Sequence, residues 1–557
     1  MASLQVIRVF GSLVIVLAST TVVAREYELL IRDGMIVDGT GNPGYIGNVG
    51  IDGDRIAAVT RDSSTTGKRE IDARGLVVSP GFIDIHSHSD FVLLEDGDAQ
   101  SKIRQGVTTE VLGEGNSAGP RVGKLGPKRV VVDGKQTQWS TLAEYFDVLD
   151  AATTSVNVAS YVGLSNVWEC VMGQSFDRPS EQQLQEMEAL VDQAMKDGTF
   201  GLSSQVMMPP GSLATTDDIV RLCKIVAPYR GIYSTHIRNE GTGVFESVRE
   251  AIEIGERAGV TVDVIHLKIA DQQFWGRMNE VVAMIDAARK RGVNVQANVY
   301  PYTRGNNNLS SIIPPWAHEG GEEALIARLK DPEEHEKLKR DIVGTIPGWY
   351  NHFTAVGKDW SRILVSGNNQ YQGLTMDRVM ALRTNGQKAP DYLEELFKIL
   401  VEQDGSVGAV YAHHTEADMN LAMVQPWCSI GSDGSAFATE GPLRRGNPHP
   451  RNFGTFPRVL GVYVRERSLL RLEDAIRKMT SLNAVKIGLT DRGLLASGQF
   501  ADVAVFDPTS TIDRATYTQP FQYNDGIRFV IVNGEIVLED GKHTGARPGR
   551  ALRRASD

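Results

Sequence analysis

The sequence predicts an α/β protein with a (β/α)8 barrel of the TIM type, a β-sandwich built from both chain ends, and an inserted lid-like subdomain. In the middle of the chain, short β-branched runs alternate with helical patterns, which is typical of a barrel or a doubly wound sheet. The two ends contain short strands broken by Gly instead. The chain has 557 residues, enough for one barrel of about 250 residues or more and an accessory domain.

The composition excludes several classes of protein. The chain is 41% hydrophobic and 23% charged, as in ordinary soluble globular proteins and unlike disordered, collagen-like or coiled-coil chains. Its net charge of −11 repels phosphate backbones, so nucleic acid is not an expected partner. The 56 Gly indicate many tight turns, which favours an enzyme over a repeat scaffold. The three Cys cannot form a disulfide framework.

Residues 1–24 are expected to be a cleaved secretory signal peptide. Arg8 is the only charged side chain in this stretch, Val9 to Ala18 is apolar, and the small residue Ala24 precedes Arg25. The uncharged run is shorter than the ~20 residues that a membrane-spanning helix needs. An uncleaved anchor or a start-site artefact are the alternatives. We therefore expect a secreted or periplasmic protein without stable membrane insertion.

The two chain ends, residues 25–79 and 484–557, are predicted to form the two halves of one β-sandwich. Asp33-Gly34, Asp52-Gly53 and Asn533-Gly534 are hairpin-turn signals between short alternating strands. An isolated set of hairpins is only marginally stable. The two β-rich pieces are therefore expected to share one core.

Residues 80–483 are predicted to form the barrel. One βα unit is clear: His236 closes a strand, residues 244–255 have helical spacing, and Val260 to His266 form the next strand. Strand-like runs that begin at Arg362 and Val407 exceed the eight strands of a barrel. We therefore place an insertion at about residues 304–366, which begins with a stretch rich in Asn and Pro, and expect it to act as a lid.

Side chains that bind metals follow several of the predicted strands. Because the carboxyl ends of parallel strands meet on one face, they are expected to converge. Burying so many polar groups without an ion would cost ~1 to 3 kcal/mol for each unpaired donor or acceptor. Imidazoles together with carboxylates suit zinc best, with other transition metals left open. The predicted ligands are His86, His88, Glu114, His236, His266 and Asp433.

The order of these residues resembles the amidohydrolase superfamily: His-x-His after the first barrel strand, His at the fifth and sixth, and Asp at the eighth. Longer motifs, STHIRNEG, VIHLKIAD, NVYPYT, GSDG and NPHPRNFGTFPRVLG, are similar to the N-acyl-D-amino-acid deacylases (D-aminoacylases). This resemblance covers essentially the whole mature chain. It implies metal-dependent hydrolysis of N-acyl-D-amino acids to a carboxylate and a free D-amino acid, and the D configuration rests on it alone.

The resemblance also implies roles for the metal-site residues. The four His are expected to hold the metal, and Asp433 to lie beside it as the acid/base group. A divalent ion polarises the amide oxygen and lowers the pKa of its bound water from about 15.7 to about 7. Asp433 would accept the proton of the attacking water and pass it to the leaving amine; a turn or helix cap is its alternative role. Glu114 stands where the family has a Cys, and a carboxylate can bridge, so one or two ions are expected.

Further residues are expected to contact the substrate. Lys268 lies in the family's VIHLK motif, where it would give electrostatic assistance, with a structural ion pair as the alternative. Arg451 in HPRN resembles the arginine that binds the substrate α-carboxylate, and Tyr300 is a second candidate for this contact. His449 either assists or caps a turn. Arg304 would favour an acidic or polar group if it faced the pocket, and would have no role if it faced solvent.

Three alternative functions follow from the same residues. A cyclic-amide hydrolase of the hydantoinase or dihydroorotase type is disfavoured by the arginine in HPRN and by the missing lysine in TFGLSSQ. A dipeptidase would need a carboxylate for the substrate ammonium, and Glu240 is the candidate. A non-catalytic binding protein would not need all four His and Asp433. In each case the expected partner is a small molecule.

Overall fold

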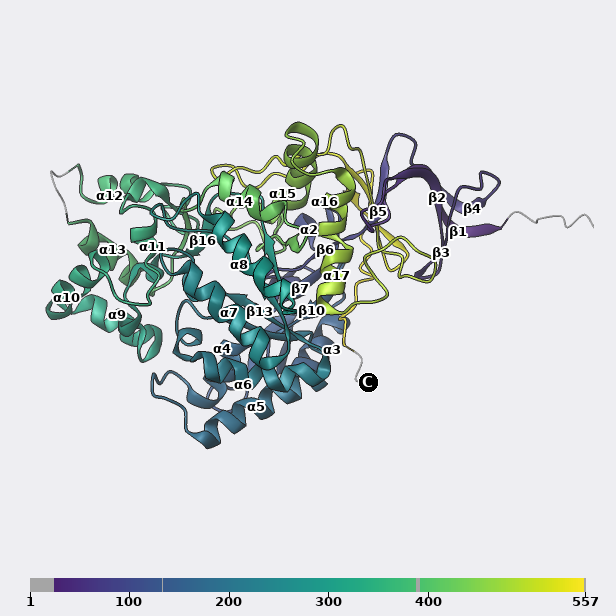
Figure 1. Cartoon of the computed structure of the whole chain (residues 1–557). Helices are drawn as coiled ribbons and strands as arrows, with labels where there is room; N and C mark the ends of the chain where they lie inside the picture. Colours follow the sequence, from purple (N-terminus) through teal and green to yellow (C-terminus); the bar gives the residue numbers. More distant parts are fainter. Residues whose placement is uncertain (1–24, 133, 387–390, 555–557) are drawn as a thin grey trace, which may run out of the picture.

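The computed structural model describes residues 25–132, 134–386 and 391–554 (Figure 1). The expected signal peptide, residues 1–24, lies outside the described residues. Within the described ranges, no helix combines the length and the apolar character needed to cross a bilayer. A helix-covered central part lies between a β-sheet on the right of Figure 1 and a mainly helical insertion on the left. The site described below lies in the central part.

The two chain ends form one nine-stranded sheet. Its order is β23-β22-β21-β20-β5-β1-β2-β3, and β4 pairs with β1. The ends meet where β20 pairs antiparallel with β5, with Val503 opposite Pro80. Buried side chains from both ends, such as Ile31 and Val505, share one core. The strands are β1 (Glu26–Ile36), β2 (Tyr45–Asp52), β3 (Arg55–Thr60), β4 (Thr66–Asp72), β5 (Val77–Pro80), β20 (Val503–Phe506), β21 (Ile527–Val532), β22 (Glu535–Glu539) and β23 (Lys542–His543).

Parallel strands form the centre of the molecule. They are assigned to two sheets, β10-β7-β6 and β11-β12-β13-β14-β15-β19. Backbone contacts connect the two sheets: Ser87 bridges to Gly434 in parallel, and Phe200 N donates to Ser160 O at 3.0 Å. The strands are β6 (Phe82–Asp84), β7 (Val107–Leu112), β10 (Asn157–Ser160), β11 (Val162–Gly163), β12 (Gly201–Gln205), β13 (Ile232–His236), β14 (Thr261–Val264), β15 (Val295–Val299) and β19 (Cys428–Ile430).

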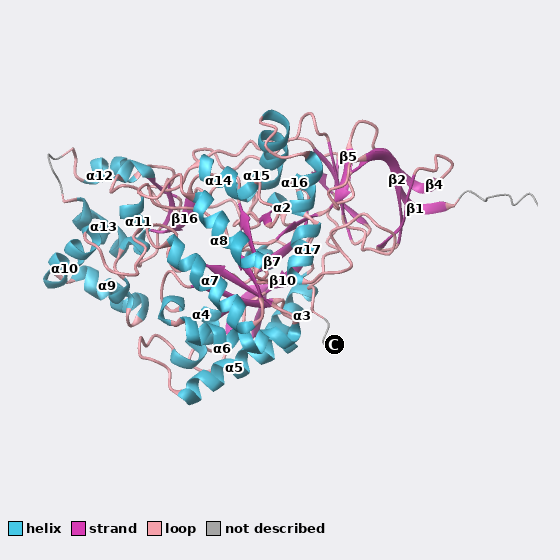
Figure 2. Ribbon diagram, viewed as in Figure 1, coloured by secondary structure: helices cyan, strands magenta, loops and turns pink. Residues whose placement is uncertain are grey.

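Helices cover these strands from outside (Figure 2). Strands such as β7 and β13 are buried at every residue, as expected of parallel strands covered on both faces. The central helices are α1 (Val92–Glu95), α2 (Gln100–Ile103), α3 (Leu142–Ala152), α4 (Leu164–Met172), α5 (Glu181–Lys196), α6 (Thr216–Val226), α7 (Val244–Ala258), α8 (Met278–Lys290), α14 (Glu416–Met423), α15 (Arg451–Arg458), α16 (Leu472–Met479) and α17 (Ser481–Ile487). A short hairpin, β8 (Lys128–Val132) and β9 (Lys135–Trp139), follows β7.

The βα unit expected around His236 is present as β13, α7 and β14. Helix α7 buries Val244, Val248 and Ala251, one stripe at helical spacing. It ends at Gly259, whose φ of 72° is the left-handed conformation that closes many helices. Strand β13 ends at His236, so this imidazole lies at the carboxyl end of the strand.

The insertion extends further than the sequence predicts. Strands β16 (Gly305–Asn308), β18 (Gly408–Tyr411) and β17 (Ile363–Val365) form a separate antiparallel sheet in that order. The run at Val407 thus pairs with β16, and the run at Arg362 pairs with β18; neither pairs with the parallel strands. A second hydrophobic core spans Leu309 to Tyr411, so the insertion continues past residue 366. Its helices are α9 (Gly321–Lys330), α10 (Pro332–Val343), α11 (His352–Ala355), α12 (Met376–Arg383) and α13 (Tyr392–Glu402).

Candidate metal centre

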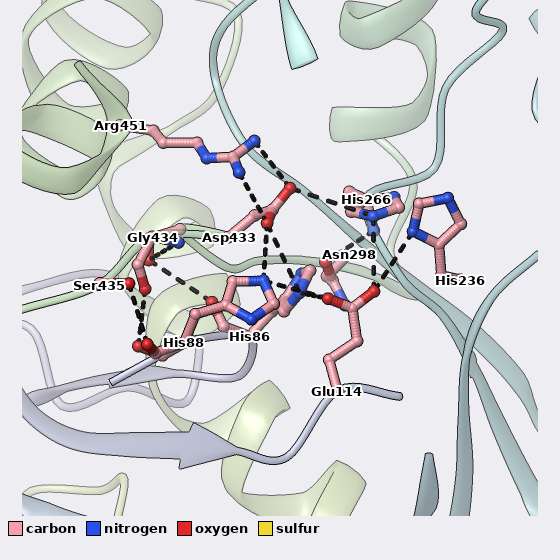
Figure 3. A network of polar contacts seen from close by, with 12 residues as sticks. His86, His88, Glu114, His236, His266, Asn298, Asp433, Gly434, Ser435 and Arg451 are labelled. Atoms are coloured by element: carbon pink, nitrogen blue, oxygen red, sulfur yellow. Dashed lines mark hydrogen bonds and ion pairs between the residues drawn. The ribbon is translucent and has the colours of Figure 1, made fainter. Parts of the chain in front are cut away.

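The six predicted metal-binding residues converge at the carboxyl ends of the parallel strands (Figure 3). His86 and His88 follow β6, Glu114 follows β7, His236 ends β13, His266 follows β14, and Asp433 follows β19. Their ligand atoms form two groups, each with its atoms within 4.8 Å of one another. The first group is His86, His88, Glu114 and Asp433, and the second is Glu114, His236 and His266.

Glu114 belongs to both groups and lies between the four imidazoles. Its Oε2 is 2.7 Å from His86 Nε2 and 3.1 Å from His88 Nε2. Its Oε1 is 3.3 Å from His236 Nδ1 and 3.8 Å from His266 Nε2. Each carboxylate oxygen therefore faces a different pair of imidazoles, the arrangement of a bridging ligand.

The backbone before Glu114 requires glycine. Gly113 has φ 87°, and a Cβ there would lie 2.5 Å from the carbonyl oxygen of Tyr161. Gly115, on the other side of Glu114, donates its N–H to Ser203 Oγ at 2.9 Å. The tight Gly-Glu-Gly turn after β7 thus directs the carboxylate toward the imidazoles.

Asp433 connects the imidazoles to Arg451. Asp433 Oδ1 is 3.1 Å from His88 Nε2 and accepts from Arg451 Nη2 at 2.9 Å, while its Oδ2 is 2.8 Å from Arg451 Nη1. Its φ of 52° is left-handed, a conformation that non-glycine residues adopt mainly where surrounding contacts enforce it. One such contact is Asp433 N–H donating to His86 O at 2.8 Å.

A buried lysine that the sequence analysis did not single out holds the base of the site. Lys102 Nζ donates to Asp84 Oδ2 at 2.7 Å, to Ser87 and Ser432 Oγ at 2.9 Å, and to Gly434 O at 3.0 Å. Asp84 also accepts from Ser432 N–H at 2.8 Å. One cation therefore ties the His-x-His segment to the loop that carries Asp433. No periodicity distinguishes this lysine from a surface one in the sequence.

Lys268 and Glu240 form a buried pair beside His266. Lys268 Nζ donates to Glu240 Oε1 at 2.6 Å, and the same oxygen lies 3.0 Å from His266 Nδ1. These contacts turn the other ring nitrogen, Nε2, toward Glu114. Glu240, considered above as a partner for a substrate ammonium, is therefore engaged by Lys268 and His266.

The pKa values reflect carboxylates packed among imidazoles. Burial raises the pKa of Glu114, but the charge of His86 and hydrogen bonds from the surrounding imidazoles hold it well below its usual range. Burial lowers the pKa of His88, but hydrogen bonds to Asp433 and Glu114 raise it to about 10. Burial and the charge of Lys268 lower the pKa of His266 to about 4. The two carboxylates thus favour a positive charge on His88, whereas burial and Lys268 keep His266 neutral.

Three buried atoms of the cluster have no hydrogen-bond partner among the described residues: His86 Nδ1, Glu114 Oε1 and His236 Nε2. Buried polar atoms are normally paired. The ligand set consists of imidazoles and carboxylates, and the unpaired Oε1 of Glu114 faces two of the imidazoles. This set fits one or two divalent transition-metal ions.

A cavity of about 600 Å³ opens onto the cluster and includes His449 and Arg451 in its lining. Both ring nitrogens of His449 face backbone atoms: Nε2 lies 3.0 Å from Arg304 O, and Nδ1 accepts from Arg451 N–H at 3.1 Å. Tyr300 lies behind Arg451, with its ring centroid 4.9 Å from the guanidinium. The Arg304 guanidinium stacks on Tyr517 at 4.5 Å, and Arg304 is not among the lining residues.

Comparison with known proteins identifies the family of this chain. The Amidohydrolase family profile matches residues 69–312 and 375–538. The chain belongs to the amidohydrolase family. This confirms the resemblance seen in the sequence motifs, and the unmatched stretch lies within the insertion.

Relatives of this amidohydrolase extend the match over nearly the whole chain. It is 33% identical to a D-aminoacylase of Alcaligenes xylosoxydans xylosoxydans, over 96% of this chain and 99% of that protein. One similar crystal structure is that of N-acyl-D-glutamate deacylase from Bordetella bronchiseptica, complexed with zinc and a phosphonate mimic of the tetrahedral intermediate. It matches with a TM-score of 0.77 and 31% identity, over 95% of this chain and 100% of that one. A D-aminoacylase structure with a binuclear metal centre matches with a TM-score of 0.77 and 32% identity over the same shares of the two chains.

Proposed function

We propose that this amidohydrolase is a metal-dependent N-acyl-D-amino-acid deacylase, which hydrolyses the amide bond to a carboxylate and a free D-amino acid. One observation carries the proposal: Glu114 lies between four imidazoles, and Asp433 lies beside them at the wall of a cavity. The likeness to a D-aminoacylase over 96% of the chain supports the substrate class.

The two ligand groups indicate how metal would be held. We assign His86, His88, Asp433 and one oxygen of Glu114 to one ion, and His236, His266 and the other oxygen of Glu114 to a second. Zinc suits this donor set best, and zinc is present in the Bordetella relative. When bound, such an ion polarises the amide oxygen and lowers the pKa of water to about 7.

Asp433 would transfer the proton. Burial raises its pKa, but the charges of Arg451 and the nearby imidazoles lower it by more, so it is ionised. As the carboxylate beside the imidazoles it would accept a proton from the attacking water. It would then deliver that proton to the amide nitrogen, since an amide anion does not leave unprotonated. The water adds to the carbonyl carbon, the C–N bond breaks, and the products are an acid and an amine.

Arg451 and Tyr300 would bind the α-carboxylate of the substrate. Arg451 Nε and the Tyr300 hydroxyl are buried without a hydrogen-bond partner among the described residues, and a guanidinium fork matches a carboxylate. His449, bonded to backbone on both sides, would fix the turn that presents Arg451. Lys268 would contribute positive charge through its pair with Glu240.

The same observations support a finer description of the fold. We infer that the parallel strands close into a (β/α)8 barrel in which β10 and β11 are one strand; the Ser87 to Gly434 bridge supports this closure. The terminal sheet would fold over its shared core as a sandwich. The insertion would serve as a lid, because Asn306, Ser366 and Gly408 line the cavity.

Cleavage before Arg25 and export to the periplasm or medium are also proposed, and N-terminal sequencing of the exported protein tests them.

A substrate panel tests the proposed function against its alternatives. The zinc-loaded protein is given N-acetyl-D-amino acids, a hydantoin, and D,D- and L,L-dipeptides, and amine release or ring opening is measured. We expect turnover of the N-acetyl-D-amino acids. Turnover of only the hydantoin or only a dipeptide would overturn the substrate assignment, and Asp433→Asn with wild-type activity would overturn the catalytic one.

A further inference from the structure

The segment that carries His86 and His88 lies beside the loop that carries Asp433. Asp433 N–H donates to His86 O at 2.8 Å, and His88 N–H donates to Gly434 O at 3.0 Å. The strands that precede them, β6 and β19, are not paired with each other in the sheets of the described chain. Contacts other than a regular strand ladder must therefore fix the distance between the His88 imidazole and the Asp433 carboxylate.

The serines that alternate with these histidines point away from the metal ligands. Ser87 and Ser89 both donate their hydroxyls to Glu110, at 2.6 Å for Ser89, while the imidazoles face the other ligands. This is the alternation expected of an extended segment. Ser89 Oγ also accepts from Ala436 N–H at 2.9 Å. The serine side of the segment thus reaches the loop that carries Asp433.

Lys102 connects the two segments more directly. Its Nζ contacts Asp84 and Ser87 on the histidine side, and Ser432 Oγ and Gly434 O on the side of Asp433. An ammonium group has three N–H donors, so these acceptors engage all of them. The side chain is fully buried. One buried cation therefore spans the gap between the two segments.

The charges around Lys102 indicate a role in geometry more than in stability. Its Nζ lies 2.7 Å from Asp84 and 3.5 Å from Glu110, so one cation serves two buried carboxylates. Buried ion pairs are weak evidence for stability, because apolar residues of similar volume often stabilise a fold as well or better. Hydrogen-bonded partners behind metal ligands, in contrast, fix the orientation of those ligands.

The network acts on only one of the two ligand groups. None of the described contacts of Lys102 reaches His236 or His266. His266 is held instead by Glu240, whose Oε1 lies 3.0 Å from the ring Nδ1. A change at Lys102 should therefore be felt first by the group of His86, His88 and Asp433.

We propose that Lys102 is a positioning residue for the first ligand group. By tying Ser87 to Ser432 it sets the separation of His88 from Asp433, and with it the affinity for the first ion and the position of the carboxylate that transfers the proton. The catalytic part of this proposal rests on the proposed function, whereas the part that concerns metal affinity does not depend on the substrate.

The test combines Lys102→Met with Asp84→Asn. The pair removes one cation and one carboxylate, so the net charge of the network is kept, and the amide oxygen can still accept from Ser432 N–H as Asp84 does at 2.8 Å. Metal content is measured after gel filtration over a series of chelator concentrations. We expect the first ion to bind about 10- to 100-fold more weakly, so that one ion per chain remains where the wild type keeps two.

Further substitutions identify the ion that is lost. Adding His236→Ala to the Lys102→Met, Asp84→Asn variant should remove the remaining ion, and adding His88→Ala should leave it in place. With N-acyl-D-amino acids and saturating zinc, kcat of the variant should fall about tenfold or more, because small displacements of reacting groups are costly, while KM stays unchanged. A side chain that served only folding would not separate the two ions or kcat from KM.

Serine variants provide a control and a test that does not require the charged residues to be changed. Ser432→Ala removes one Lys102 contact and should weaken the first ion in the same direction. In the Lys102→Met, Asp84→Asn background it should add nothing, because the shared partner is gone. Ser204→Ala is the control: Ser204 is fully buried and bonds to Tyr233 and Thr235 at 2.7 and 3.0 Å, so both ions and kcat should be unchanged.

The possible results separate this proposal from the proposed function. Loss of both ions in parallel, or wild-type retention of both ions in the charge-matched variant and in Ser432→Ala, would overturn the role of Lys102. A higher KM with unchanged kcat would overturn its effect on the proton-transferring carboxylate. If no N-acyl-D-amino acid is cleaved while the variants still lose the first ion, the deacylase function is refuted and the positioning of the first ligand group stands.

Discussion

Replacing Glu114 by alanine is expected to lower the metal content from two ions per chain to at most one. Glu114 is the residue shared by the two ligand groups of the described chain. Without it the second group keeps only His236 and His266, fewer than the three protein ligands typical of catalytic zinc sites. The first group keeps His86, His88 and Asp433 and can still hold an ion.

The lost ion has a measurable effect on stability. At free zinc 100-fold above its dissociation constant, one bound ion stabilises the folded state by about 2.7 kcal/mol. Glu114→Ala should lack this increment in urea unfolding with and without zinc, and metal analysis after gel filtration should show the lower stoichiometry. Asn116→Ala is the matched control, because Asn116 lies in the same turn, is exposed and makes no side-chain hydrogen bond among the described residues. Two ions and full activity in Glu114→Ala would refute the bridging role.

Three further substitutions test the surroundings of the site. Glu240→Gln should weaken metal retention about 10- to 100-fold in chelator competition, because Glu240 orients His266; the exposed Glu246→Gln is its control, and equal retention would contradict the role. Arg451→Ala should raise KM about tenfold or more for N-acyl-D-amino acids but not for their methyl esters, since it removes hydrogen bonds to a charged group; an unchanged KM would remove the assignment. Lys486→Met should lower the free energy of unfolding, measured in urea, by ~3 to 5 kcal/mol. The substitution leaves the buried Asp263 without the lysine Nζ that lies 2.7 Å from its Oδ1; wild-type stability would disprove this.

The site residues could be predicted from sequence because their positions follow from strand periodicity. His86, Glu114 and His266 each come directly after a short buried run, and the carboxyl ends of parallel strands meet. The family motifs then supplied what periodicity cannot, such as the D configuration. The convergence of all six residues confirms this geometric part of the prediction.

Other features depend on contacts that a local pattern does not contain. The runs at Arg362 and Val407 resemble barrel strands in sequence. Only their antiparallel pairing, of β17 with β18 and of β18 with β16, assigns them to the insertion. Lys102 and Glu240 are buried charges, and in a sequence a buried charge looks like a surface one. The direction of the Arg304 side chain is likewise set by its stacking on Tyr517.

The most direct test of the central claim is amine release from N-acetyl-D-methionine and N-acetyl-L-methionine, measured with the zinc-loaded protein, after chelation, and after zinc is restored. The account predicts turnover of the D enantiomer alone, its loss on chelation and its recovery with zinc. Turnover of the L enantiomer alone, or activity that survives complete metal removal, would contradict it.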